Sequence, residues 1–274
     1  MPELPEVETV RLSLLPAVGA VISSAWDSGK GLHMQKKPPR AKLKKLVGAT
    51  ITALRRHGKY LLVDTDSGSS ILVHLGMTGQ VRVRPHGAAR EKHAHIVLGL
   101  GDRELVYIDA RRFGQIDVYE RGKEKELPAL AELGPDPIVD GIDPAAFFAR
   151  SRKKKTALKA FILDQTVLAG VGNIYASEAL WLAKLRPTTR AFRLTEQKAA
   201  ALAKAIDDVL RTSLANRGTS LRDYVDGDGV SGSNYAALKV YDRKGEPCAR
   251  CKTPIKRTIL QGRATYFCPT CQTP

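Results

Sequence analysis

The stretch Tyr60-Leu61-Leu62-Val63-Asp64-Thr65-Asp66-Ser67-Gly68-Ser69-Ser70-Ile71-Leu72-Val73-His74 contains two apolar runs on either side of a polar turn. The runs Tyr60–Asp64 and Ser70–His74 have the length and aliphatic composition of short strands. Between them, Asp66-Ser67-Gly68 has the composition of a turn. This part of the chain is therefore predicted to be β-structure.

Similar runs continue on both sides of this stretch, with turn residues such as Gly101-Asp102 between them. Many short strands at this spacing predict a sandwich or barrel. An amphipathic helix is expected before them, because Val7, Val10 and Leu14 recur at helical spacing. The further predicted strands are Ala49–Leu54, Gln80–Arg84, His95–Leu100, Glu104–Ile108 and Gln115–Tyr119.

From about residue 143 the hydrophobic period becomes helical. Leu158, Phe161 and Ile162 share one helix face. A second face precedes the stop signal Gly218 and contains Leu202, Ile206, Val209, Leu210 and Leu214. Residues 219–238 are rich in Gly, Ser and Asp, which is typical of a mobile loop.

The charge of the chain indicates a polyanionic partner. Its 274 residues carry 44 Lys and Arg against 28 Asp and Glu, a net charge of +16, and are 43% hydrophobic. This balance favours nucleic acid, with a membrane surface as the alternative. No apolar stretch approaches the ~18 residues of a spanning helix, and the acidic start is unlike a signal peptide, so we expect a cytoplasmic protein. The basic run Lys36, Lys37, Arg40, Lys42, Lys44, Lys45 is interpreted as a solvated face.

All four cysteines lie in the last 27 residues, as Cys248, Cys251, Cys268 and Cys271. Their spacing, Cys-x2-Cys-x16-Cys-x2-Cys, is typical of two chelating loops that share one tetrahedral ion. We expect one structural Zn²⁺. Two disulfides are the alternative, which the missing export signal disfavours.

The chain opens Met1-Pro2-Glu3-Leu4-Pro5-Glu6, so loss of Met1 would leave a secondary amine beside a carboxylate. An α-amino group titrates near ~8 and is a nucleophile that can form a Schiff base. Alternatively, Pro2 and Pro5 only preset the first turn of a helix.

Gly170-Val171-Gly172-Asn173-Ile174-Tyr175-Ala176 lies between two predicted helices. Its glycines permit close backbone approach, and Asn173 is placed to cap the following helix, whose free N–H groups suit a phosphate. An ordinary connecting loop is the alternative. Positive charge upstream comes from Arg152, Lys153, Lys154 and Lys155.

Several separate motifs together resemble the formamidopyrimidine-DNA glycosylase family, which excises 8-oxoguanine and ring-opened purines. They are Pro2 through Glu8, His74-Leu75-Gly76-Met77-Thr78-Gly79, Arg111-Arg112-Phe113-Gly114, Gly170 through Ala176, and Gly262-Arg263-Ala264-Thr265 before Cys268. The resemblance implies an α+β multidomain fold. Its expected parts are an N-terminal β-sandwich with an N-terminal helix (1–135), a helix–two-turns–helix domain (143–225), a mobile lesion-recognition loop (226–238) and a β-hairpin zinc finger (239–274).

The resemblance also implies a bifunctional glycosylase and abasic-site lyase. Pro2 would attack the deoxyribose C1′, Glu3 would act as general acid toward the ring oxygen, and β,δ-elimination would cleave the strand. Lys59 matches the family's active-site lysine, with proton transfer and phosphate contact as its role. Arg263 matches the arginine that grips phosphates beside the lesion and helps the second elimination.

A base inside a duplex must be flipped out before attack, and the resulting void must be filled. Met77, Arg111 and Phe113 match the family's three void-filling residues. DNA-contacting positions of the family match His93, Arg111, Lys154 and Asn173. The implied partner is double-stranded DNA with oxidised bases or abasic sites, bound by a monomer in the bacterial cytoplasm or nucleoid, without a redox cofactor.

The chain departs from the family's usual sequence at two places, and two alternative functions stay open. Ala110 stands where the family usually has proline, and the loop 226–235 diverges from the better-known members. An enzyme resembling endonuclease VIII would share the Pro2 chemistry but prefer oxidised pyrimidines, although such chains typically begin Pro-Glu-Gly-Pro-Glu and this one has Leu4. A non-catalytic zinc-containing DNA-binding protein would need none of Pro2, Glu3 and Lys59.

Overall fold

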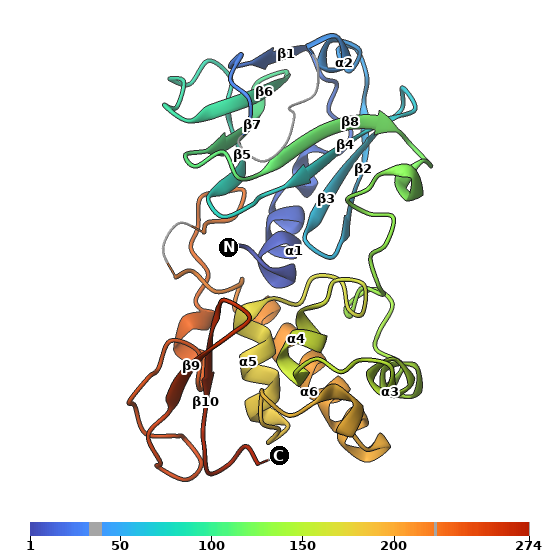
Figure 1. Ribbon diagram of the computed structural model, residues 1–274. Coiled ribbons are helices and arrows are strands. Elements are labelled where there is room, and N and C mark those ends of the chain that lie inside the picture. Colours follow the sequence, from blue (N-terminus) through green and yellow to red (C-terminus); the bar gives the residue numbers. More distant parts are fainter. Residues whose placement is uncertain (33–39, 222–223, 274) are drawn as a thin grey trace. The chain divides into compact units, whose positions relative to one another are not determined.

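The computed structural model of the chain describes residues 1–32, 40–221 and 224–273, which form two compact units (Figure 1). The first unit comprises residues 1–131 and returns for residues 216–233. The second comprises residues 132–215 and the residues from 234 onward. The first unit therefore contains the predicted N-terminal helix and strands, and the second contains the helices predicted from residue 143 onward and the cysteines.

The first unit contains two four-stranded antiparallel sheets. One sheet has the order β1 (Ser24–Asp27), β6 (Ala94–Leu100), β7 (Arg103–Asp109), β5 (Gly79–Pro85). The other has the order β2 (Ile51–His57), β3 (Tyr60–Thr65), β4 (Ser69–His74), β8 (Gln115–Glu120). The expected N-terminal sandwich is confirmed.

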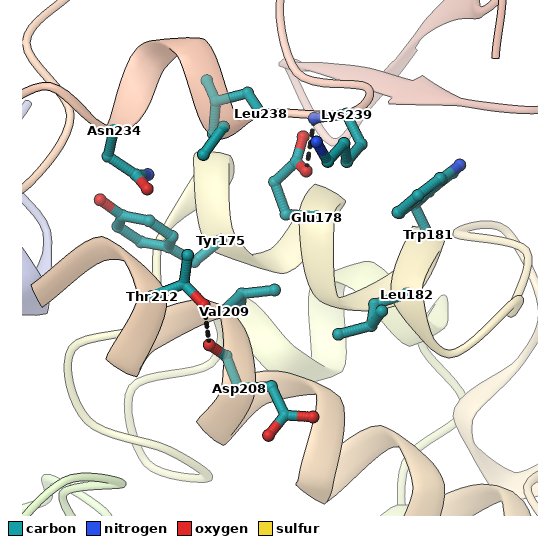
Figure 2. A pocket seen from close by; sticks show the side chains of 11 residues that line it. Tyr175, Glu178, Trp181, Leu182, Asp208, Val209, Thr212, Asn234, Leu238 and Lys239 are labelled. Atoms are coloured by element: carbon teal, nitrogen blue, oxygen red, sulfur yellow. Dashed lines mark hydrogen bonds between the residues drawn. The ribbon is translucent and has the colours of Figure 1, made fainter. Parts of the chain in front are cut away.

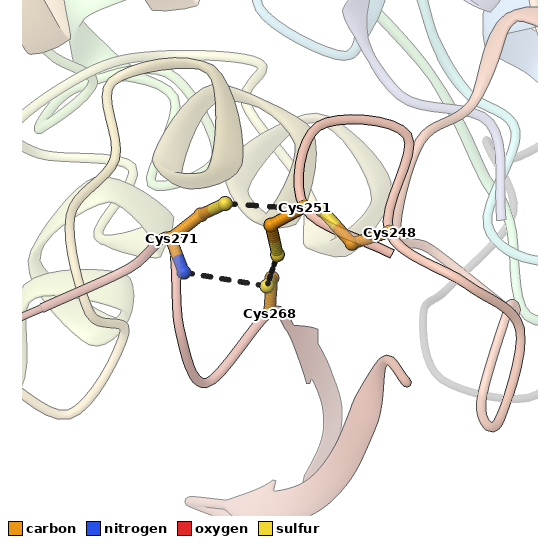
Figure 3. Close-up of side chains that lie close together, drawn as sticks. All are labelled: Cys248, Cys251, Cys268 and Cys271. Carbon is orange, nitrogen blue, oxygen red and sulfur yellow. Dashed lines mark hydrogen bonds between the residues drawn. The ribbon is translucent and has the colours of Figure 1, made fainter. Parts of the chain in front are cut away.

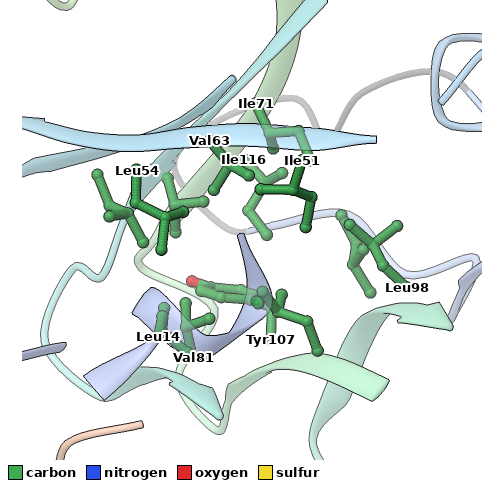
Figure 4. Close-up of a cluster of buried hydrophobic side chains, with 14 of the residues drawn as sticks. Leu14, Ile51, Leu54, Val63, Ile71, Val81, Leu98, Tyr107 and Ile116 are labelled. Carbon is green, nitrogen blue, oxygen red and sulfur yellow. The ribbon is translucent and has the colours of Figure 1, made fainter. Parts of the chain in front are cut away.

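Aliphatic side chains from both sheets meet in one core (Figure 4). Val63 and Ile71 come from the β2-β3-β4-β8 sheet, whereas Val81 and Tyr107 come from the other. Side chains alternate along a strand, so one face of each sheet supplies this core. Helix α1 (Leu4–Ser13) packs on β2 and β3 and adds its own apolar face.

Two short elements in the first unit were not predicted. Strand β1 is an edge strand of four residues whose inward positions are Ala25 and Asp27 and whose exposed positions include Trp26, so its sequence carries no hydrophobic strand pattern. Helix α2 (Arg40–Lys44) lies in the basic run, where Arg40 pairs with Asp27 at 2.9 Å. Lys36 and Lys37 of that run lie outside the described residues. The short 3-10 helices of this unit are η1 (Leu15–Ala17) and η2 (Glu124–Glu126).

The inner side of α1 also makes a charged contact with β2. Glu8 accepts hydrogen bonds from Arg11, at 2.7 Å, and from Arg56, at 2.8 Å. The side chain of Arg56 is only 1% exposed, and Glu8 supplies a carboxylate beside this buried charge. Burial acts to raise the pKa of Glu8, but the hydrogen bonds from Arg11 and Arg56 outweigh it, and the net shift is downward.

We expect Glu8→Gln to lower the free energy of unfolding at pH 7 by about 2 kcal/mol, since a buried guanidinium loses its counter-charge. A carboxylate whose pKa is lowered by folding stabilises the protein above its unfolded pKa, and this contribution is lost as pH falls through the folded pKa. The difference in the free energy of unfolding between wild type and variant should therefore shrink below about pH 4. Urea unfolding between pH 3 and 8 measures it.

The matched control is Glu196→Gln, at the exposed first turn of α6 (Glu196–Ala215). It should change stability by less than about 0.5 kcal/mol at every pH. A Glu8→Gln effect that is equally small, or that does not depend on pH, would contradict the structural role given to Glu8.

The second unit packs helices around the predicted apolar faces. Leu158, Phe161 and Ile162 are all buried on α4, as are Leu202 and Ile206 on α6. The elements are α3 (Pro144–Arg152), α4 (Leu158–Leu163), α5 (Asn173–Leu182), η3 (Ala191–Arg193), α6, η4 (Asn234–Ala237), and a hairpin of β9 (Lys256–Leu260) and β10 (Arg263–Phe267). No helix in the described part of the chain is long and apolar enough to cross a membrane.

Residues 216–233 are tied to the first unit by backbone hydrogen bonds. The N–H of Thr219 donates to Glu6 at 2.8 Å, and the N–H of Gly227 donates to Ser13 at 2.8 Å. The N–H of Val83 on β5 donates to the carbonyl of Gly227 at 3.1 Å. These bonds fix the segment on the helix that begins the chain. The domain limits given from the sequence, and the mobility of residues 226–238, stay predictions.

Candidate functional site

Pro2 and Glu3 stand at the start of α1, and both are buried. Glu3 is the N-cap and forms a capping box, in which its own N–H donates to Glu6 at 2.8 Å. Met1, by contrast, is 47% exposed. The Glu3 carboxyl therefore lies at the positive end of the helix.

Lys59 lies in the tight turn between β2 and β3, next to Gly58 with its φ of 57°. Its side chain lies near His74, the last residue of β4. Burial, and then the charge of Lys59, lower the pKa of His74 to about 4. At neutral pH the imidazole is therefore uncharged.

The structure brings the three predicted void-filling residues together. Met77 is 42% exposed in the β4–β5 loop, and Arg111 and Phe113 lie in the β7–β8 loop. The guanidinium of Arg111 stacks 4.5 Å from the centre of the Phe113 ring. The Arg111 N–H donates to the hydroxyl of Thr78, next to Met77, at 3.2 Å. His93 lies just before β6, and its carbonyl accepts the N–H of Asp109 at the end of β7.

In the second unit, the prediction that Asn173 caps the following helix is wrong. The N-cap of α5 is Gly172, in an extended conformation, and Asn173 is the first helical residue. Its amide Nδ2 instead donates to the carbonyl of Ala264 at 3.0 Å, because the side chain turns toward the zinc hairpin. Arg263, the neighbour of Ala264, is exposed at the start of β10.

Sequence reasoning missed Lys159. Its side chain is fully buried, and its Nζ donates to the Ala264 carbonyl and the Thr265 hydroxyl, both at 3.0 Å. The available signal was a lysine beside Leu158 on a helix whose other residues are mostly apolar. Lys159 and Asn173 thus hold the strand that presents Arg263.

Lys154 also has a partner within the second unit. Its Nζ lies 2.9 Å from the carboxylate of Asp164, and the Lys154 side chain is 40% exposed. Burial acts to raise the pKa of Asp164, but the bond from Lys154 and bonds from Thr166 lower it overall. The cation is therefore held in place yet remains accessible.

Four free thiols converge at the end of the chain (Figure 3). The Sγ atoms of Cys248, Cys251, Cys268 and Cys271 all lie within 4.8 Å of one another. A tetrahedral Zn²⁺ with bonds of ~2.3 Å places its sulfur ligands about 3.8 Å apart, so this donor set fits one zinc ion. Four protein ligands leave no open position, so the ion would hold the hairpin rather than take part in chemistry. Trp181 of α5 donates its indole N–H to Cys248 at 3.5 Å.

Purified protein should contain one zinc per chain by plasma emission spectrometry. Cys251→Ser should lose most of this zinc and lower the melting temperature, since metal binding is coupled to folding in such modules. Thr270→Ser, which keeps the hydroxyl beside Cys271, is the control and should retain the metal. Full zinc occupancy in Cys251→Ser would show that the four thiols do not act as a set.

A cavity of about 170 Å³ lies between α5, α6 and η4 (Figure 2). Glu178 lies on its wall, but its carboxylate accepts the backbone N–H groups of Lys239, Val240 and Tyr241 at 2.8–2.9 Å. Burial is the largest influence on the pKa of Glu178 and raises it, against the opposing effect of these three bonds. Glu178 therefore anchors the segment that enters the zinc hairpin.

Three family models match the chain in order along its length. They are the formamidopyrimidine-DNA glycosylase N-terminal domain (residues 1–116), the H2TH domain of the same family (133–225), and a zinc finger found in FPG and IleRS (245–274). The chain belongs to the formamidopyrimidine-DNA glycosylase family. It is a DNA glycosylase of base excision repair.

Similar proteins match over the whole chain. The formamidopyrimidine-DNA glycosylase of Herpetosiphon aurantiacus is 42% identical over 99% of this chain and 100% of its own length. A Lactococcus lactis FPG mutant, solved in complex with a Fapy-dG containing DNA, has a TM-score of 0.92 and 34% identity, with 100% of both chains covered. The MutM (FPG) protein of Thermus thermophilus has a TM-score of 0.88 and 38% identity, with 99% and 98% covered.

Proposed function

We propose that this glycosylase removes oxidised purines from double-stranded DNA through a covalent bond to Pro2, and then cleaves the strand as an abasic-site lyase. The observation that carries the proposal is the buried Pro2-Glu3 pair at the positive end of α1, in a chain that matches the family from end to end. The net charge of +16 fits a DNA partner, and we infer a monomer that acts in the bacterial cytoplasm.

Removal of Met1 turns the Pro2 nitrogen into a secondary amine. Attack on C1′ forms an N–C1′ bond and breaks the glycosidic bond, and the base leaves with its electron pair and takes up a proton. Opening of the sugar ring then gives an iminium ion, whose fixed positive charge acidifies the C2′ proton. Loss of that proton expels the 3′ phosphate, and a second elimination expels the 5′ phosphate.

Glu3 and Lys59 supply the proton transfers. Glu3 would protonate the sugar ring oxygen as the ring opens, a role that requires a carboxyl held next to the nucleophile. The capping box holds it there. Lys59 would contact a phosphate and transfer a proton, and it lies beside the uncharged imidazole of His74.

Residues of both units would bind the DNA backbone. In the second unit these are Lys154, Asn173 and Arg263, and in the first His93 and Arg111. The Lactococcus lactis and MutM structures include complexes with abasic-site DNA and with carbocyclic 8-oxo-G containing DNA. By similarity we infer the same partner for this chain. Phosphate contacts release counterions, so the affinity should depend on salt.

Borohydride trapping tests the covalent step. We expect reduction to fix a covalent adduct between wild-type enzyme and a duplex with 8-oxoguanine opposite cytosine, and peptide mass spectrometry to place the sugar on Pro2. The adduct should be strongly reduced in Pro2→Gly, which replaces the secondary amine with a primary one, and lost in protein that retains Met1. Denaturing gel electrophoresis measures the trapped fraction.

Pro16→Gly makes the same substitution at an exposed position of η1 and should leave trapping intact. Wild-type protein that binds the duplex but yields no adduct and no cleavage would favour a non-catalytic DNA-binding protein. A sugar attached to another side chain would overturn only the role of Pro2 and would leave the rest of the proposed function standing.

The choice of base separates this proposal from an endonuclease VIII-like activity. Leu4, and the assembled Met77, Arg111 and Phe113, support the purine branch. We expect kcat/KM for 8-oxoguanine duplexes to exceed that for thymine glycol duplexes by at least about 10-fold, equivalent to ~1.4 kcal/mol of transition-state discrimination. An abasic-site duplex, which both branches cleave, normalises the two assays. The reverse preference would assign the chain to the pyrimidine branch.

A further inference from the structure

Asp109, the last residue of β7, is fully buried at the junction of the two loops that carry Met77, Arg111 and Phe113. One carboxylate oxygen accepts the hydroxyl of Thr78 at 2.6 Å. The other accepts the N–H of Gly114 at 2.8 Å and the hydroxyl of Tyr107 at 3.0 Å. The carboxylate thus receives donors from both loops and from its own strand.

The backbone of Asp109 is tied as well. Its N–H donates to the carbonyl of His93 at 3.0 Å, and its carbonyl lies 3.0 Å from Nε2 of His95. The opposite ring nitrogen of His95 lies 3.1 Å from the hydroxyl of Ser28. Burial, and then the charge of Asp109, raise the pKa of Tyr107 above its ordinary value, so the phenol stays a donor at neutral pH.

The two loops also interlock without room for a side chain. Gly76 has a φ of 60°, and a Cβ there would lie 2.5 Å from the carbonyl carbon of Phe113. A Cβ at Gly114 would lie 1.8 Å from the Tyr107 hydroxyl. Thr78 completes the joint, since its hydroxyl donates to Asp109 and accepts the N–H of Arg111. Either loop can therefore move only if this joint opens.

We propose that Asp109, acting through Thr78, is a positioning residue that preassembles Met77, Arg111 and Phe113 into one rigid wedge before DNA is bound. This inference rests on the proposed void-filling role of the three residues. A wedge that is already ordered loses less conformational entropy when it enters the base stack. The hydrogen bonds to Asp109 also account for Ala110, which stands where the family usually has proline. They fix a loop whose own backbone is less restricted than it would be with proline.

The test uses two substrates that differ in their need for a wedge. A duplex with 8-oxoguanine opposite cytosine needs base flipping and void filling, whereas a single-stranded oligonucleotide with an abasic site needs only the Pro2 chemistry. Thr78→Val removes the hydroxyl with little change in shape and breaks the link between the loops. We expect its kcat/KM on the duplex to fall about 10-fold, the effect of losing one charge-assisted hydrogen bond. Cleavage of the single strand should stay within about twofold of wild type.

Asp109→Asn is the second variant, because an amide has only one acceptor oxygen and cannot accept both the Thr78 hydroxyl on one side and the Gly114 N–H on the other. It should show a larger loss on the duplex than Thr78→Val, with single-strand cleavage again retained. Thr212→Val, which removes a hydroxyl that bonds within α6, is the matched control and should leave both activities unchanged. Thermal unfolding of each variant accompanies the assays.

The wedge also predicts coupling between mutations. If Thr78 acts by holding the Met77 loop against the loop that carries Arg111 and Phe113, its effect should depend on Met77. In a Met77→Ala background, Thr78→Val should then lower kcat/KM on the duplex by less than about twofold. Full additivity, an unchanged duplex rate in Thr78→Val, or parallel losses on both substrates would overturn the inference. Wild-type protein inactive on both substrates would instead overturn the proposed function.

Discussion

A carboxylate removed from water must have its oxygens occupied by hydrogen-bond donors, and this constraint organises the loops of the protein. Asp109 collects donors from the two wedge loops. Glu6 collects the N–H groups of Glu3 and of Thr219. Asp226 accepts two N–H groups from its own loop, and Glu178 accepts three. In each case a segment without regular structure is fixed because a buried charge requires it.

The same constraint divides what the sequence predicted from what it did not. The seven strands from β2 to β8 follow apolar runs that can be read locally, and the faces of α4 and α6 follow a helical period. A buried carboxylate leaves no such local mark, because Asp109 and Glu6 look like any surface acid in the sequence. Their partners come from other loops, and Glu6 bonds a residue 213 positions away.

The candidate site shows the same division. Individual residues such as Pro2, Lys59 and Met77 could be named from motifs, because their neighbours in the chain identify them. Their supports could not be named. Lys159, which holds the carbonyl of Ala264 beside Arg263, is 105 positions from it. The side chain of Asn173 turned away from its own helix toward the same carbonyl, which local capping rules do not anticipate.

The return of residues 216–233 to the first unit affects how the chain folds during synthesis. While the ribosome is still translating the second unit, the carboxylate of Glu6 and the hydroxyl of Ser13 lack Thr219 and Gly227. The N-terminal sandwich can collapse early, but its first helix acquires its last partners only after more than two hundred codons have been read. Domain-by-domain folding from the N-terminus is thus replaced here by a late closing step. A nascent chain that stalls before this segment emerges carries an N-terminal helix that lacks both partners.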